Sequence, residues 1–76
     1  MTAAAVLEIA GSTAPLSACL LFVAGFETAE VCRAMGVRNT QLKPIMDHAL
    51  NAWRTDPEFR TAYDQGVTMI EESKHA

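Results

Sequence analysis

Polar side chains suited to reading another molecule are concentrated in a short central segment, residues 33–43. Arginine can bond both acceptors on the edge of a guanine, and asparagine can pair with an adenine in the same two-point manner. Lysine, threonine and a further arginine suit the phosphate oxygens of the DNA backbone. The sequence therefore predicts a contact surface for double-stranded DNA made of Arg33, Arg38, Asn39, Thr40 and Lys43.

The other reactive side chains do not form a catalytic or metal-binding pattern. His48 and His75 are isolated, and Asp47 would not face its neighbour His48 because adjacent helical residues point to different sides. Cys19 and Cys32 lack the spacing of metal ligands and fall in apolar segments, so we expect two reduced core thiols. We therefore expect no enzyme activity, no cofactor and no metal site.

A helix-turn-helix pattern surrounds the polar segment. In this pattern Cys32 is the small residue at the crossing of the two helices, and Gly36 is the glycine of the turn. The apolar residues between the helices are Val31, Met35, Val37, Leu42 and Ile45. A small residue lets two helices cross closely, and glycine supplies the left-handed backbone of the turn. We expect this motif at about residues 28–54. Two-helix corners also occur as packing units without nucleic acid, so a purely structural corner stays open as an alternative.

Composition and periodicity predict an all-α fold, a small bundle of four to five helices in a single domain of residues 1–76. Half of the residues are apolar, only 7% are aromatic, and good helix formers dominate. Capping residues and glycines predict helices at about 3–10, 13–24, 28–35, 39–53 and from 57 onward. So many apolar residues on a short chain leave hydrophobic surface uncovered, which favours a homo-oligomer or a protein partner.

Several helix ends can be assigned to individual residues. Thr28 is expected to cap the third helix, and Asp56 is expected to cap the last one, with Pro57 in its first turn. Pro44 is expected in the first turn of its helix, where a missing amide costs little. The terminal residues 71–76 are expected to fray into solvent.

Apolar side chains of the last two helices repeat with helical periodicity. The inner stripe of the fourth helix is expected to contain Leu42, Ile45, Met46, Ala49, Leu50 and Trp53. Phe59, Ala62, Tyr63, Gly66, Val67 and Ile70 are expected to line the inner face of the fifth helix. Trp53, Phe59 and Tyr63 are interpreted as core anchors, with an outward, partner-facing Trp53 as the alternative.

The uncharged stretch 9–26 approaches the length of a membrane span. Small residues and Pro15 interrupt it, and no basic residue precedes it as a signal peptide would require. We therefore expect a buried helix, with one inner stripe of Leu16, Leu20, Val23 and Ala24, in a protein of the bacterial cytoplasm.

Charge is distributed unevenly along the chain, whose net charge is −3. Residues 27–55 carry four basic and three acidic side chains, whereas residues 56–76 carry two basic and five acidic ones. No segment is basic enough to hold DNA by charge alone, so any DNA contact must be focused. Asp47, Pro44 and the acidic last helix count against DNA binding.

Residues 22–66 resemble the small terminase subunits of tailed phages and related helix-turn-helix proteins. The matching segments are 22–25, 30–37 and 53–64, and the most specific is Trp53 followed by Asp56-Pro57-Glu58-Phe59. The resemblance implies DNA recognition and oligomerisation. The interval from Gly36 to Trp53 is about seven residues longer than in that family. A difference of about seven residues is close to two helical turns, so Trp53 stays on the same side of its helix as in the family. The short length favours a free-standing regulator or interaction module.

Two functions from different classes remain. The first is a phage or prophage DNA-binding protein that acts as an oligomer in packaging-site recognition or transcription control. The second is a small phage-encoded protein that binds and inhibits or adapts a host protein without contacting DNA.

Overall fold

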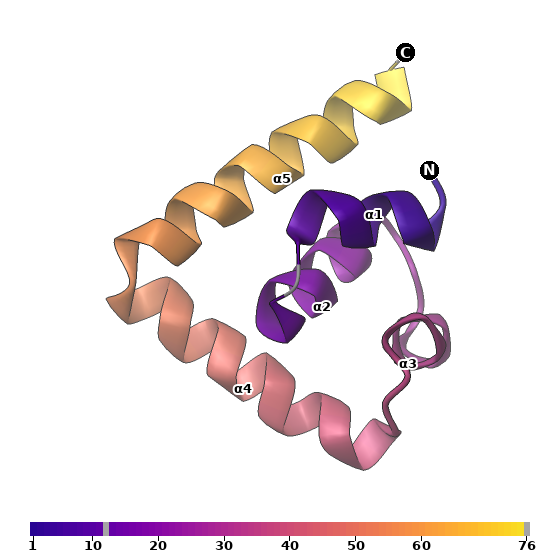
Figure 1. The fold of residues 1–76 in the computed structure, drawn as a ribbon, viewed down its shortest axis with the longest axis vertical. Helices are drawn as coiled ribbons and strands as arrows, with labels where there is room; N and C mark the ends of the chain where they lie inside the picture. The colour runs from indigo at the N-terminus through magenta and orange to yellow at the C-terminus, as the bar shows by residue number, and fades with distance from the viewer. Residues whose placement is uncertain (12, 76) are drawn as a thin grey trace.

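Five helices make up the part of the chain that the structure, a computed structural model, describes: residues 1–11 and 13–75. This confirms the all-α prediction. The helices are α1 (Ala3–Ala10), α2 (Ala14–Val23), α3 (Thr28–Met35), α4 (Asn39–Thr55) and α5 (Pro57–His75). Figure 1 shows α4 and α5 as two long arms that meet at one end, with α1 and α2 between them and α3 near the beginning of α4.

The helix α2 is the centre of the bundle and contacts all four other helices. Its buried residues are Leu16, Ser17, Ala18, Leu20 and Leu21, which lie on several sides rather than on one stripe. The prediction of a single inner stripe, with Val23 and Ala24, was therefore too narrow, because both of those residues are only half-buried. The hydroxyl of Ser17 donates to the carbonyl oxygen of Thr13 over 2.9 Å, which satisfies its buried polar group.

The apolar character of α2 is explained by its burial inside the bundle. None of the helices that the structure describes combines the length and hydropathy that a bilayer crossing needs. Val6, Leu20, Leu21, Val31 and Ile70 are the largest fully buried side chains, and they come from four different helices. The core is therefore built around α2 by aliphatic side chains.

The helix α5 approaches α2 closely at Gly66. A Cβ atom added to this glycine would lie 2.6 Å from Cδ1 of Leu20, which is too close for two carbon atoms. Leu20 is fully buried and has little room to move aside. Gly66 therefore sets how near the two helices can pack.

The predicted boundary between α4 and α5 is confirmed. Asp56 Oδ1 accepts a hydrogen bond from the amide of Glu58 over 2.9 Å, and Pro57 is the first residue of α5. A side-chain acceptor at this position satisfies an amide that has no partner within the helix. The end of α5 differs from the prediction, because residues 71–75 stay helical and Lys74 Nζ donates to the carbonyl oxygen of Val23 over 3.4 Å.

Two predictions about helix starts were wrong. Thr28 is the first residue of α3 rather than its cap, and the preceding Glu27 donates its amide to the side chain of Glu30 over 3.1 Å. Pro44 is the sixth residue of α4 rather than part of the first turn. Its ring removes the amide that would bond the carbonyl of Thr40, and this loss is tolerable because Thr40 is exposed to water.

Candidate functional site

The helices α3 and α4 meet at a corner, here called the α3–α4 corner, that consists of residues 28–45. Gly36 ends α3 with φ 69° and ψ 33°, the left-handed conformation expected from the sequence. The amide of Val37 donates to the carbonyl of Cys32 over 3.0 Å, and that of Gly36 donates to the carbonyl of Arg33 over 3.3 Å. These two bonds form the usual glycine-terminated helix end and turn the chain into α4.

Apolar side chains hold the inside of this corner. Val31 is fully buried and Leu42 is 5% exposed. Met35, Val37 and Ile45 are half-buried and pack against the core. The five apolar positions expected to fill the angle therefore do so, two of them completely.

The five predicted DNA-contact residues are all exposed at this corner. Arg33 lies on α3, Arg38 precedes α4, and Asn39, Thr40 and Lys43 lie in the first turns of α4. The amide of Arg38 donates to Oε1 of Gln41 over 2.8 Å, which fixes the start of the helix. Because the exposed end of a helix carries unsatisfied amides and a positive dipole end, this part of the corner attracts anions.

Charges near the corner are partly compensated. Lys43 Nζ lies 3.3 Å from Oδ2 of Asp47, one turn further along α4, and both side chains are largely exposed. Within the described residues, the guanidinium groups of Arg33 and Arg38 have no ion-pair partner. The side chains of Arg33 and Arg38 are thus available to a ligand. To bind a ligand, Lys43 must break its ion pair with Asp47 or contact both partners at once.

Asn39 has a second role that the sequence did not reveal. The thiol of Cys32 donates to Oδ1 of Asn39 over 3.2 Å, so the carboxamide links α3 to the first residue of α4. Cys32 is buried, as expected for the small residue at a helix crossing, whereas Asn39 remains exposed. The carboxamide is therefore oriented by the fold before any ligand arrives.

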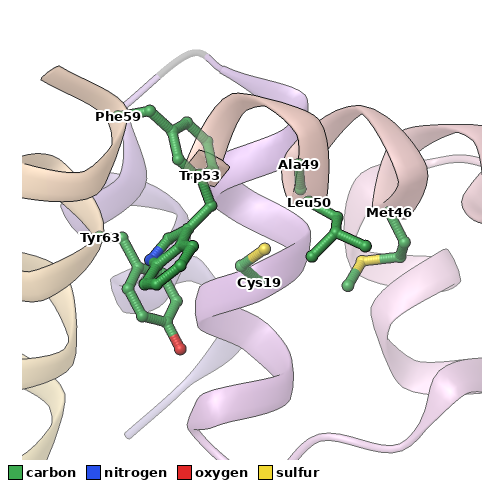
Figure 2. A pocket seen from close by; sticks show the side chains of 7 residues that line it. All are labelled: Cys19, Met46, Ala49, Leu50, Trp53, Phe59 and Tyr63. Carbon is green, nitrogen blue, oxygen red and sulfur yellow. The ribbon is translucent and has the colours of Figure 1, made fainter. Parts of the chain in front are cut away.

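A second feature is an apolar hollow of about 290 Å³ between α2, α4 and α5. Cys19 lies at its centre, with Trp53 and Tyr63 on one side and Leu50 and Met46 on the other, as Figure 2 shows. Burial raises the pKa of the Cys19 thiol, which keeps it protonated at neutral pH. The hollow offers hydrophobic contact and no ionised group of its own.

Trp53 and Leu50 correct the prediction that both lie on an inner stripe. Trp53 is 44% exposed and Leu50 is 52% exposed. The guanidinium of Arg60 lies 4.7 Å from the centre of the Trp53 ring, and its Nε donates to the carbonyl oxygen of Trp53 over 2.8 Å. Phe59 is buried and Tyr63 is half-buried, so these two aromatic residues join the helices as expected. Trp53 is instead partly exposed at the edge of the hollow and is not the core anchor expected from the sequence.

Histidine, cysteine and acidic side chains do not gather into a metal-binding group anywhere in residues 1–11 and 13–74. His75 belongs to the end of α5, and the predicted isolation of its side chain lies outside what the structure describes. Comparisons with known protein families, curated protein sequences and solved structures find no significant match to this chain.

Proposed function

We propose that this protein binds double-stranded DNA through a helix-turn-helix formed by α3 and α4, as a binding protein rather than an enzyme. The observation that carries the proposal is that all five polar residues, Arg33, Arg38, Asn39, Thr40 and Lys43, are exposed within one corner whose apolar residues pack against the core. A helix-turn-helix uses the beginning of its second helix to contact base edges in the major groove. The first turns of α4 would take that place.

Each polar side chain can be given a contact by its chemistry. Arg38 can donate to two acceptors of a guanine, while Lys43, Thr40 and Arg33 can bind phosphate oxygens. An asparagine pairs with adenine by accepting through Oδ1 and donating through Nδ2. Oδ1 of Asn39 already accepts from Cys32, but a carbonyl oxygen has two lone pairs, so it can accept a second bond.

Electrostatics limits what one copy can do. Each chain brings three cations to the corner, and Asp47 compensates one of them. Affinity from charge grows with the number of phosphates neutralised, so a single copy would bind weakly. We therefore propose that the protein acts as an oligomer. The setting proposed for it, packaging-site recognition or transcription control of a phage or prophage in the bacterial cytoplasm, rests on the resemblance of residues 22–66.

Fluorescence anisotropy with a mixed-sequence duplex of about two helical turns tests this proposal. Arg38→Ala should weaken binding by about 1–3 kcal/mol. Lys74→Ala is the matched control, because it removes an exposed cation whose Nζ donates to Val23 at the end of α2, outside the corner, and it should leave binding unchanged. Equal losses for both variants would mean that the protein binds DNA without using the corner.

The hollow beside Trp53 favours the second candidate function, in which the chain binds a host protein and no DNA. Exposed large apolar side chains beside a concave apolar surface are typical of protein contacts. The net charge of −3 also suits this function better than DNA binding. Absence of duplex binding at about 50 mM salt, where electrostatic attraction is strong, would favour this candidate.

A further inference from the structure

One side of α4 forms a stripe that the bundle covers only in part. It contains Met46, Asp47, Leu50, Trp53 and Arg54, here called the outer seam. Met46 is half-buried against the core, and the other four residues are exposed. The residues besides Leu50 lie three or four positions before or after it and therefore share its side of the helix. Leu50 and Trp53 are among the large hydrophobic residues that remain exposed, and the apolar hollow lies beside them.

We propose that the outer seam is the contact surface of a homodimer in which two copies of α4 pair antiparallel about a two-fold axis at Leu50. A two-fold axis perpendicular to the helices places each edge of the seam against the same edge of the second copy, so a residue three or four before Leu50 faces the residue three or four after it on that edge. Leu50 faces Leu50, Met46 faces Trp53, and Asp47 faces Arg54. Each of the last two contacts occurs twice, because a two-fold contact is made by the same surface on both copies.

Charge selects the antiparallel arrangement. A parallel pair of α4 helices would bring opposite edges of the seam together, so Asp47 would face Met46, Arg54 would face Trp53, and neither charge would meet its opposite. The antiparallel pair instead makes two contacts between Asp47 and Arg54, which are attractive. The seam is therefore complementary in charge to itself in one direction only, and this identifies a second copy of the chain as its occupant.

Apolar contact supports the same arrangement. Met46 and Trp53 both line the hollow, on the edge of the seam that is nearer to α2 and α5. Trp53 of a second copy would reach Met46 on this edge and cover the opening of the hollow. Leu50 would lose its contact with water at the centre of the dimer, so Leu50 and Trp53, the large hydrophobic side chains exposed on α4, would be removed from solvent together.

The dimer is argued from the seam alone, but one consequence rests on the proposed DNA-binding function. Thr40 lies ten residues before Leu50, which is about 15 Å along a helix. Two copies paired at Leu50 would therefore hold their Thr40 residues about 30 Å apart, and their Arg38 residues about 36 Å apart. Successive major grooves on one side of a duplex are about 34–36 Å apart. Asp47 would also turn towards Arg54 and leave Lys43 free for phosphate.

Charge reversal tests the dimer directly. The variants Asp47→Arg and Arg54→Asp each turn two attractive contacts into two repulsive ones, so sedimentation equilibrium should show a dimer dissociation constant at least about tenfold higher than for the unmodified protein. An equimolar mixture of the two variants restores both attractive contacts in a heterodimer. The mixture should associate within about threefold of the unmodified protein. Both positions are exposed, and circular dichroism checks that each variant stays folded.

Two neutral positions provide a matched pair. Leu50→Glu should raise the dimer dissociation constant by at least about tenfold because it places a charge on the axis. Met69→Glu is its control, since Met69 is 51% exposed on α5, outside the seam, and the substitution should leave association unchanged. A monomeric unmodified protein, a mixture that fails to associate, or equal effects of both glutamates would overturn the proposed dimer.

The outcomes for the dimer and for DNA binding are separable. A dimer that responds to these variants but binds no duplex would overturn the DNA-binding function and leave the seam in place. Duplex binding by a protein that remains monomeric would overturn the seam and leave the α3–α4 corner in place.

Discussion

The thiol of Cys32 donates to Oδ1 of Asn39 over 3.2 Å, and this bond joins the middle of α3 to the first residue of α4. Asn39 is one of the residues that we propose to read DNA, so its orientation depends on a buried thiol on the neighbouring helix. The corner therefore combines a structural residue and a recognition residue in one contact.

Substitutions at Cys32 separate its size from its hydrogen bond. Cys32→Ala should cost at most about 1 kcal/mol of unfolding free energy, because it removes one bond whose acceptor is exposed to water. Cys32→Val should cost about 1–3 kcal/mol, since a branched side chain does not fit a close helix crossing. Urea denaturation measures both. A greater loss for alanine than for valine would show that the bond, not the small size, is what the corner requires.

Trp53 and Phe59 should differ in their contribution to stability although both are aromatic. Phe59 is 9% exposed, so Phe59→Ala should lower the free energy of unfolding by about 3–5 kcal/mol. Trp53 is 44% exposed, so Trp53→Ala should lower the free energy of unfolding by only about 1–2 kcal/mol. Most of this loss comes from the contact between its ring and the guanidinium of Arg60. The measurement is denaturation at a protein concentration low enough to exclude dimers. Equal losses would place Trp53 in the core after all.

Gly66 should resist even a single added methyl group. Gly66→Ala raises the helix propensity of α5, which stabilises the protein by about 1 kcal/mol. It also brings a Cβ to 2.6 Å from Leu20 Cδ1, and this overpacking should cost about 1–3 kcal/mol. The free energy of unfolding should therefore fall. In a double-mutant cycle with Leu20→Ala, the cost of Gly66→Ala should vanish because the clashing methyl is gone. Gln65→Ala, at an exposed neighbour on α5, is the control. Destabilisation that persists in the double mutant would show that the clash is not its cause.

Cys19 should react slowly with thiol reagents. Burial raises the pKa of its thiol, so the rate of iodoacetamide alkylation should keep rising at pH values where a free cysteine has already reached its plateau. The folded state holds this proton more tightly than the unfolded state, so the free energy of unfolding should also fall as pH rises above the ordinary pKa of cysteine. Mass spectrometry of the alkylated peptide gives the rate. A plateau at the pH of free cysteine would contradict the burial of this thiol.

Local signals in the sequence were sufficient to place the five helices to within a few residues and to place the glycine turn between α3 and α4. Asp56-Pro57 marks the start of α5, and Gly36 marks the end of α3, because both act through their own backbone. The all-α fold follows from the same local preferences. The exposed placement of Arg38 and Lys43 was predictable once the buried positions of the corner were identified.

Contacts between distant helices were not predictable in this way. The apolar arc of α4 is broad, and its periodicity shows which residues share a side but not which part of that side α2 covers. The buried and half-buried positions Leu42, Ile45, Ala49 and Ala52 follow one line, where small alanines permit close approach. Leu50 and Trp53 lie beside that line and remain exposed. The apolar arc of α4 is wider than one neighbouring helix can cover. This width was the signal in the sequence that part of the arc would stay exposed.

The salt dependence of duplex binding tests the central claim most directly. If the α3–α4 corner neutralises phosphates, the affinity of the unmodified protein should fall steeply between about 50 and 200 mM salt, and Lys43→Ala should reduce the slope of that fall by about one. A protein that binds no duplex at the lower salt concentration, or one whose affinity does not respond to salt, would contradict the assignment of this corner to DNA.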